Sequence, residues 1–169
     1  MKVLVTGGVR SGKSRHAESL LSGAVTYVAP GPSVDDADWA ARIAAHRARR
    51  PASWRTLETR DLAGALGTDG PVIVDCLGTW LTGVLDERGL WDSPSDEVTS
   101  VVSSLLDETL AVLSTRDQAV LVTNEVGLGV VPEHRSGRLF RDLLGLVNQR
   151  LATGCDEVHL VVAGRVVRL

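Results

Sequence analysis

Residues 2–14 read KVLVTGGVRSGKS. The first five, KVLVT, are β-formers stopped by two glycines, which predicts a short buried strand. Residues 7–14, GGVRSGKS, match the pattern G-x-x-x-x-G-K-[ST], with a strand expected before it and a helix after it. In such loops backbone N–H groups curl around phosphate oxygens, and the following helix adds a favourable dipole. A chance glycine turn is the alternative, and the flanking elements disfavour it.

This loop assigns residue roles directly. Lys13 is expected to reach the β- and γ-phosphates of a nucleotide, and the Ser14 hydroxyl to ligate Mg²⁺. The expected nucleotide-binding residues of the loop are Gly7, Gly8, Val9, Arg10, Ser11, Gly12, Lys13 and Ser14.

The composition limits the class of protein. The chain has 169 residues, 44% of them hydrophobic and 23% charged, which is typical of one globular domain, taken as residues 1–169. A net charge of −3 argues against nucleic-acid binding. Cys76 and Cys155 fit neither a zinc site nor a disulfide framework, so a reduced, cytoplasmic setting is expected. The first apolar run is too short for a membrane span or a signal peptide.

Strands and helices are expected to alternate along the chain. Apolar strands that alternate with helices indicate an α/β fold with a mainly parallel sheet covered on both faces. Residues 157–162 and 165–169 are expected to close it as an antiparallel hairpin. The other expected strands are 2–6, 25–28, 54–57, 71–75 and 118–123, and the expected helices are 11–22, about 35–49, 61–66, 77–85, 96–114 and 135–151.

Two acidic residues follow buried strands, where ligand crevices form in open α/β sheets. Asp75 closes PVIVD and is interpreted as a Mg²⁺ ligand, with capping of the next helix as the alternative. Glu125 follows QAVLVTN, and three roles are open: orienting an attacking hydroxyl, acting as a base, or bonding a loop backbone. The chain has no guanine-reading N-K-x-D motif, so a GTPase switch is excluded.

A basic stretch surrounds one histidine. Residues 41–50 read ARIAAHRARR, with His46 among four arginines. On a helix His46 shares a face with Trp39 and Ile43, so a packed ring with solvated arginines around it is one interpretation. The other is chemical, because imidazole is a nucleophile that guanidinium groups keep unprotonated. His16 follows the phosphate loop, so it is expected either to lie near the phosphates or, with preference, to be a helix-surface residue; it is the next candidate nucleophile after His46. His134 and His159 are expected to be structural. Trp54 and Trp80 are expected either to stack on a base or to pack in the core. Arg135, Arg138, Arg141 and Arg150 are expected either to gather phosphates or to support subunit contacts.

Five motifs in order resemble one family. They are TGGVRSGKS at the N-terminus, ARIAAHRARRPASWRT at 41–56, LVTNEVGLGVVPE at 121–133, FRDLLGLVNQRLA at 140–152 and DEVHLVVAG at 156–164. Together they resemble the bifunctional adenosylcobinamide kinase / adenosylcobinamide-phosphate guanylyltransferase of cobalamin biosynthesis, over essentially the whole chain. The combination of TNEVG with VNQRLA is far more specific than a phosphate loop.

The resemblance implies a RecA-like P-loop fold assembled as a homotrimer. It implies that ATP or GTP phosphorylates the aminopropanol hydroxyl of adenosylcobinamide, and that GMP then passes from GTP through a covalent histidine, matched here by His46, to give adenosylcobinamide-GDP. Arg42 and Arg49 would then stabilise phosphate charge. This chain has Ala45-His46 where a relative has two histidines, and Asp75 where the family can have Glu.

Two other functions compete with this one. The first is a P-loop small-molecule kinase without nucleotidyl transfer, in which His46 is inert. The second is a non-catalytic, nucleotide-dependent regulatory subunit.

Overall fold

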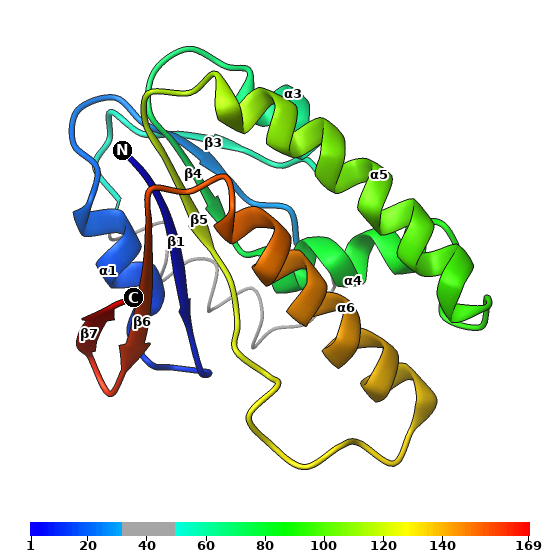
Figure 1. The fold of residues 1–169 in the computed structure, drawn as a ribbon. Coiled ribbons are helices and arrows are strands. Elements are labelled where there is room, and N and C mark those ends of the chain that lie inside the picture. The colour runs from blue at the N-terminus through cyan, green and yellow to red at the C-terminus, as the bar shows by residue number, and fades with distance from the viewer. Residues whose placement is uncertain (32–49) are drawn as a thin grey trace.

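One sheet organises the chain in the computed structural model, which describes residues 1–31 and 50–169 (Figure 1). Within those residues the sheet has seven strands in the order β3-β2-β4-β5-β1-β6-β7. All neighbouring pairs are parallel except β6 and β7, which form the antiparallel closing hairpin. The strands are β1 (Lys2–Gly7), β2 (Thr26–Val28), β3 (Arg55–Leu57), β4 (Val72–Asp75), β5 (Ala119–Val122), β6 (Glu157–Val162) and β7 (Arg165–Arg168). The predicted α/β fold is therefore confirmed.

Helices cover both faces of the sheet. Among the described helices, α1 alone lies on one face, and the others gather on the opposite face (Figure 1). The helices are α1 (Lys13–Ser19), α3 (Leu62–Leu66), α4 (Leu77–Glu87), α5 (Ser95–Ser114) and α6 (Arg135–Ala152). The central strands β1, β4 and β5 are apolar in nearly every position because both of their faces are buried, whereas the edge strand β3 (RTL) is largely exposed.

Side chains alternate between the two faces along each strand. Val120 and Val122 of β5 lie in the apolar cluster under α1, whereas Ala119 and Leu121 lie in the cluster formed with α3, α4, α5 and α6. In β4, Ile73 lies under α1, while Val72 and Val74 lie on the other face. This period of two fixes which face each residue at a strand end continues.

Most predicted elements are present, with ends shifted by one or two residues. The first helix is the main correction: it was predicted over residues 11–22, and α1 spans only Lys13–Ser19. Ser11 and Gly12 belong to the loop, since Gly12 has a left-handed backbone (φ 97°) that a helix does not admit. The helix predicted at about 35–49 lies outside the described residues.

Both tryptophans left open by the sequence take part in packing. Trp80 is 1% exposed in the core and donates its Nε1–H to the carbonyl oxygen of Arg60 at 3.0 Å. Trp54 is half-buried against the cluster under α1. The structure thus decides for core packing of Trp80 over stacking on a base. Among residues 1–31 and 50–169, no helix has the length and apolar character needed to cross a membrane.

Candidate functional site

The loop between β1 and α1 has the geometry of a phosphate cradle. A Cβ atom at Gly7 would lie 2.4 Å from the carbonyl oxygen of Val161, so only glycine fits where β1 ends. The Nζ of Lys13 donates to the carbonyl oxygen of Gly8 at 3.1 Å, and the Lys13 side chain is buried. The lysine that the pattern assigns to nucleotide phosphates therefore bends back over the loop.

The closing hairpin supports this loop from outside. The backbone N–H of Gly164, in the turn between β6 and β7, donates to the carbonyl oxygen of Ser11 at 2.8 Å. A Cβ atom on Gly12 would lie 3.6 Å from the Cα of Gly164, in van der Waals contact with the turn. The sequence predicted the hairpin without this role, because no local pattern links Ser11 with Gly164, 153 positions further along the chain.

Asp75 lies at the carboxyl end of β4, on the α1 face. The Tyr27 hydroxyl donates to Asp75 Oδ2 at 3.0 Å, and burial together with this carboxylate raises the pKa of Tyr27. The guanidinium carbon of Arg50 lies 3.2 Å from the centroid of the Tyr27 ring, a cation–π contact. Cys76 is the N-cap residue of α4, and no side-chain hydrogen bond caps that helix. The capping alternative for Asp75 is therefore not what the structure shows.

The segment after β5 is fixed by an asparagine from α6. The Thr123 hydroxyl donates to Asn148 Oδ1 at 2.6 Å, and Asn148 Nδ2 donates to the carbonyl oxygen of Asn124 at 3.0 Å. These bonds use both ends of the Asn148 amide and join two of the motifs that carried the family resemblance. Sequence reasoning quoted Asn148 inside VNQRLA but gave it no role.

Glu125 lies beside the first glycine of the loop. Its backbone N–H donates to the carbonyl oxygen of Gly7 at 3.2 Å, and its Oε1 accepts from the backbone N–H of Gly127 at 2.7 Å. Of the three roles left open for Glu125, the bond to a loop backbone is thus present in the structure.

Cys76, which follows Asp75 at the end of β4, contacts the segment after β5. Its Sγ lies 3.5 Å from Asn124 Oδ1. Burial and the charge of Asp75 raise the pKa of this thiol, while hydrogen bonds with Thr79 and the charge of Lys13 act in the opposite direction. The thiol is therefore held protonated and acts as a hydrogen-bond donor, not as a nucleophile.

The residues present fit a magnesium ion whose coordination is completed by the phosphates of a bound nucleotide. Among residues 1–31 and 50–169, no three His, Cys, Asp or Glu side chains gather closely enough to form a metal site by themselves. Mg²⁺ in nucleotide-binding loops needs only one or two protein oxygens, with phosphates and waters as the other ligands. Ser14, in the first turn of α1, and Asp75 supply this kind of hard oxygen donor.

The sequence model of one family, described as cobinamide kinase / cobinamide phosphate guanyltransferase, matches residues 3–169. The bifunctional adenosylcobalamin biosynthesis protein CobU of Salmonella typhimurium is 43% identical over 185 residues, covering 100% of this chain and 99% of that protein. CobU of Escherichia coli K12 is 41% identical over 184 residues, with coverage of 100% and 99%. CobP of Pseudomonas aeruginosa is 44% identical over 172 residues, with coverage of 97% and 94%. The chain belongs to this family.

The family resemblance noted in the sequence is thereby confirmed. Of the proposed site residues of this cobinamide kinase / guanyltransferase chain, the structure gathers the loop, Asp75 and Glu125 at the carboxyl edge of the sheet. His46, Arg42 and Arg49 lie outside the described residues.

His16 and His159 form a chain of hydrogen bonds away from that edge. His159 is 2% exposed; its Nε2 lies 2.7 Å from Glu157 Oε2, and its Nδ1 lies 2.9 Å from His16 Nε2. Since the carboxylate accepts from Nε2–H, Nδ1 of His159 accepts from His16 Nε2–H. The pair joins α1 to β6, which agrees with the structural role expected for His159 and gives His16 a hydrogen-bond partner in place of the free helix surface that was expected.

This pair predicts a pH-dependent stability. Burial, His159 and Arg168 lower the pKa of His16 from its ordinary value of 6.5, so below that pH the unfolded chain binds more protons than the folded chain. The contribution of the neutral His16 side chain to the stability of the folded chain is therefore complete above pH 6.5 and is lost as the pH falls below that value. We expect the melting temperature to fall by a few degrees more between about pH 7 and about pH 5 in wild type than in His16→Asn. The exposed His134, changed to Asn, is the control; equal pH slopes in all three proteins would contradict the prediction.

The four arginines of α6 bind protein groups on the face opposite α1. Arg135 donates to the carbonyl oxygens of Trp91 and Ser93, and Arg141 to that of Gly127 at 2.9 Å. Arg138 donates to the carbonyl oxygens of Pro132 and Glu133, and Arg150 pairs with Asp107. They fix the loop before α6 and the packing of α6 on α5.

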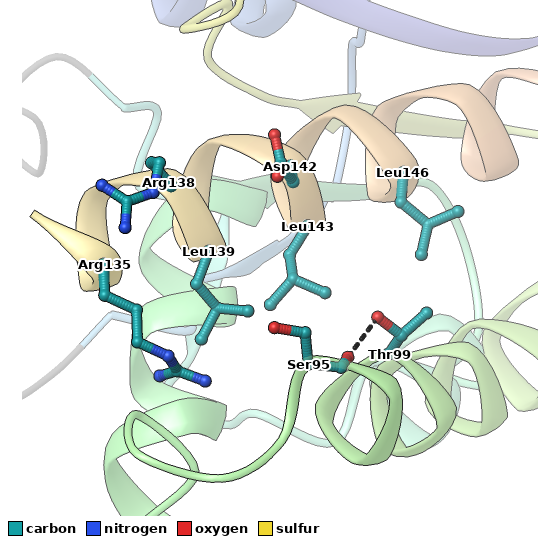
Figure 2. Close-up of a pocket in the computed structure, with 8 residues that line it drawn as sticks. All are labelled: Ser95, Thr99, Arg135, Arg138, Leu139, Asp142, Leu143 and Leu146. Carbon is teal, nitrogen blue, oxygen red and sulfur yellow. Dashed lines mark hydrogen bonds between the residues drawn. The ribbon is translucent and has the colours of Figure 1, made fainter. Parts of the chain in front are cut away.

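A groove of about 440 Å³ lies between the start of α5 and the N-terminal part of α6, from Arg135 to Leu146 (Figure 2). Leucines of α6 form one wall, and Ser95 and Thr99 of α5 face them. The groove belongs to the helical layer on the face opposite α1, so it is separate from the phosphate loop. Its lining residues are Ser95, Thr99, Arg135, Arg138, Leu139, Asp142, Leu143 and Leu146.

Proposed function

We propose that this chain carries out both transfers of its family on adenosylcobinamide. ATP or GTP first phosphorylates the aminopropanol hydroxyl, and GTP then guanylylates the resulting phosphate to give adenosylcobinamide-GDP. One observation carries the proposal. The phosphate loop with its lysine, the carboxylates of Asp75 and Glu125, and the TNEVG segment lie together at the carboxyl ends of the central strands, in a chain that matches the family model over residues 3–169.

In the first transfer the acceptor hydroxyl oxygen attacks the γ-phosphorus, and the bond to the bridging oxygen breaks, releasing a nucleoside diphosphate. Loop N–H groups and Lys13 hold the phosphates. Ser14 and Asp75 would hold Mg²⁺, which when bound neutralises phosphate charge. We assign orientation of the acceptor hydroxyl, and receipt of its proton, to the second oxygen of Glu125, which no described residue contacts by hydrogen bond.

In the second transfer an imidazole nitrogen of His46 attacks the α-phosphorus of GTP, and pyrophosphate leaves. A phosphate oxygen of the phosphorylated acceptor then displaces His46, which is regenerated. Arg42 and Arg49 stabilise charge on the phosphates and keep the imidazole neutral. The described end of the same basic stretch supports this placement, because Arg50 stacks on Tyr27, the hydrogen-bond donor to Asp75.

Further properties belong to the same proposal. Residues 1–169 form one catalytic domain, built around the sheet of the described residues, and assemble as a homotrimer. Exposed apolar side chains beyond β5, Leu128 at 87% and Val130 at 95%, support contacts between subunits. Two free cysteines, Cys76 and Cys155, support a reducing, cytoplasmic location.

One experiment tests the two transfers separately. The protein is incubated with adenosylcobinamide, Mg²⁺ and either γ-labelled ATP or α-labelled GTP. We expect γ-label in a cobinamide phosphate, and α-label both in adenosylcobinamide-GDP and on the protein. Label in the phosphate alone would leave a kinase without nucleotidyl transfer, and label in no product would leave a regulatory subunit.

Replacing Asp75 with asparagine keeps an acceptor for Tyr27 but removes the charge that Mg²⁺ needs. We expect kinase turnover to fall about 10²-fold and the magnesium required for half-maximal nucleotide binding to rise. Equilibrium binding titrated with Mg²⁺ measures the second effect without turnover. The exposed Asp69, changed to Asn, is the matched control. A magnesium dependence identical to wild type would remove Asp75 from the metal site.

A further inference from the structure

We propose that the side-chain amide of Asn124 donates a hydrogen bond to the terminal phosphoryl group of the nucleotide held by the phosphate loop. Asn124 would then be a catalytic residue of the kinase step that distinguishes a triphosphate from a diphosphate. The inference rests on the proposed kinase function and adds to it a residue that reads the transferred group.

The strand order places Asn124 between the two parts of the site. β5 pairs with β1 on one side and with β4 on the other. Val122 is in register with Val5 on β1 and with Asp75 on β4. Two residues further on, Asn124 is level with Gly7, where the phosphate loop begins, and is one strand away from Asp75.

The alternation of side chains puts Asn124 on the face of α1. The side chain of Thr123 points to the opposite face, where it bonds Asn148 of α6. Asn124 contacts Cys76, which packs against the apolar cluster under α1. The α1 helix begins with Lys13 at this end of the sheet, so Asn124 and the phosphate loop share one face as well as one edge.

The amide of Asn124 has one end bonded and the other end open. A thiol donates, so the Asn124 oxygen that lies 3.5 Å from Cys76 Sγ is the carbonyl Oδ1, and this fixes the orientation of the amide. A Cβ atom on Gly78 would lie 3.0 Å from that oxygen, so the start of α4 leaves room for it. No residue within 1–31 and 50–169 accepts a hydrogen bond from Nδ2. The Asn148 bond to the Asn124 backbone holds this donor in place.

Transfer of the γ-phosphoryl group is favoured by a hydrogen-bond donor at this position. As the γ-phosphorus moves from the bridging oxygen to the acceptor hydroxyl oxygen, negative charge is spread over its three equatorial oxygens. A neutral amide N–H fixed by protein bonds stabilises that charge without reorganisation. The same donor meets nothing when ADP occupies the loop, because the γ-phosphoryl group is absent.

The test is equilibrium binding of ADP and of a non-hydrolysable ATP analogue, each with Mg²⁺, to wild type, Asn124→Ala and Asn124→Asp; GDP and a GTP analogue are titrated in parallel. Asn124→Asp retains Oδ1 for Cys76 and loses the N–H donor. We expect each variant to bind the triphosphate analogue at least about 10-fold more weakly and to bind the diphosphate within about 2-fold of wild type. Gln118→Ala, an amide removed at the other end of β5, is the control and should change neither affinity.

Melting temperatures establish that each variant is folded. A triphosphate-to-diphosphate affinity ratio unchanged in both folded variants would overturn the assignment, and so would equal loss of both affinities, which marks a structural role. Failure of wild type to bind any nucleotide would instead refute the proposed kinase function, and the Asn124 assignment with it.

Discussion

Lys13→Ala is expected to lower kcat/KM for phosphorylation of adenosylcobinamide by about 10³-fold or more. The ammonium group is the cation that the loop aims at the β- and γ-phosphates, and it stabilises charge that develops as the γ-phosphoryl group moves. In the structure this side chain is buried and bonds the loop through the Gly8 carbonyl oxygen. Steady-state assays with γ-labelled ATP, and again with GTP, measure the loss.

Lys2 provides the matched control, because it is at the opposite end of β1 and lies far from the loop along the strand. Lys2→Ala should retain wild-type turnover. The melting temperature of Lys13→Ala shows whether removal of a buried lysine disturbs the fold. Cobinamide phosphorylation at the wild-type rate by folded Lys13→Ala protein would exclude the loop from the mechanism.

His46→Ala is expected to abolish covalent labelling by α-labelled GTP, and with it guanylyl transfer. A histidine nucleophile forms a phosphorus–nitrogen bond, so the wild-type label should be lost in acid and should survive alkali. Phosphorylation of adenosylcobinamide does not use that nitrogen, so it should continue in the variant. The two activities of one chain would then separate at a single residue, as judged by label on the protein and by products from each labelled nucleotide.

Two other histidines serve as controls for this prediction. His134→Ala removes an exposed imidazole at the start of α6 and should label like wild type. His16 is the next candidate nucleophile, but its Nε2 is bonded to His159. If acid-labile label persists in His46→Ala and disappears in His16→Ala, the nucleophile is His16 on α1 and not His46. Kinase activity in a wild-type protein that never labels would support the kinase without nucleotidyl transfer.

Much of the fold follows from local patterns. Apolar runs predicted β1, β4 and β5 to within two residues at each end, and Ala163-Gly164 predicted the turn of the hairpin. The first helix was predicted too long at both ends: Ser11 and Gly12 belong to the phosphate loop, and Leu20 and Leu21 keep the helical spacing although α1 ends at Ser19. Hydrophobic periodicity predicts which residues are buried, but it predicts the ends of a helix less accurately, because the backbone can leave the helical conformation while the apolar spacing continues.

Some residues of the candidate site could likewise be predicted from local sequence patterns. The sequence by itself determined Lys13, Ser14 and the glycines of the loop, because these residues act through spacing within one short segment. It also placed Asp75 and Glu125 at strand ends, and the family resemblance singled out His46.

Only the tertiary structure decided which of these residues meet and what holds them. The bonds from Tyr27 to Asp75, from Asn148 to the segment after β5, and from Gly164 to the phosphate loop each join residues from separate elements. Such pairs depend on strand order and register, which a local pattern of polar and apolar residues does not specify. Asn124 shows this most clearly: in the sequence it is a polar residue beside Glu125, and its place between the phosphate loop and Asp75 exists because β5 lies between β1 and β4.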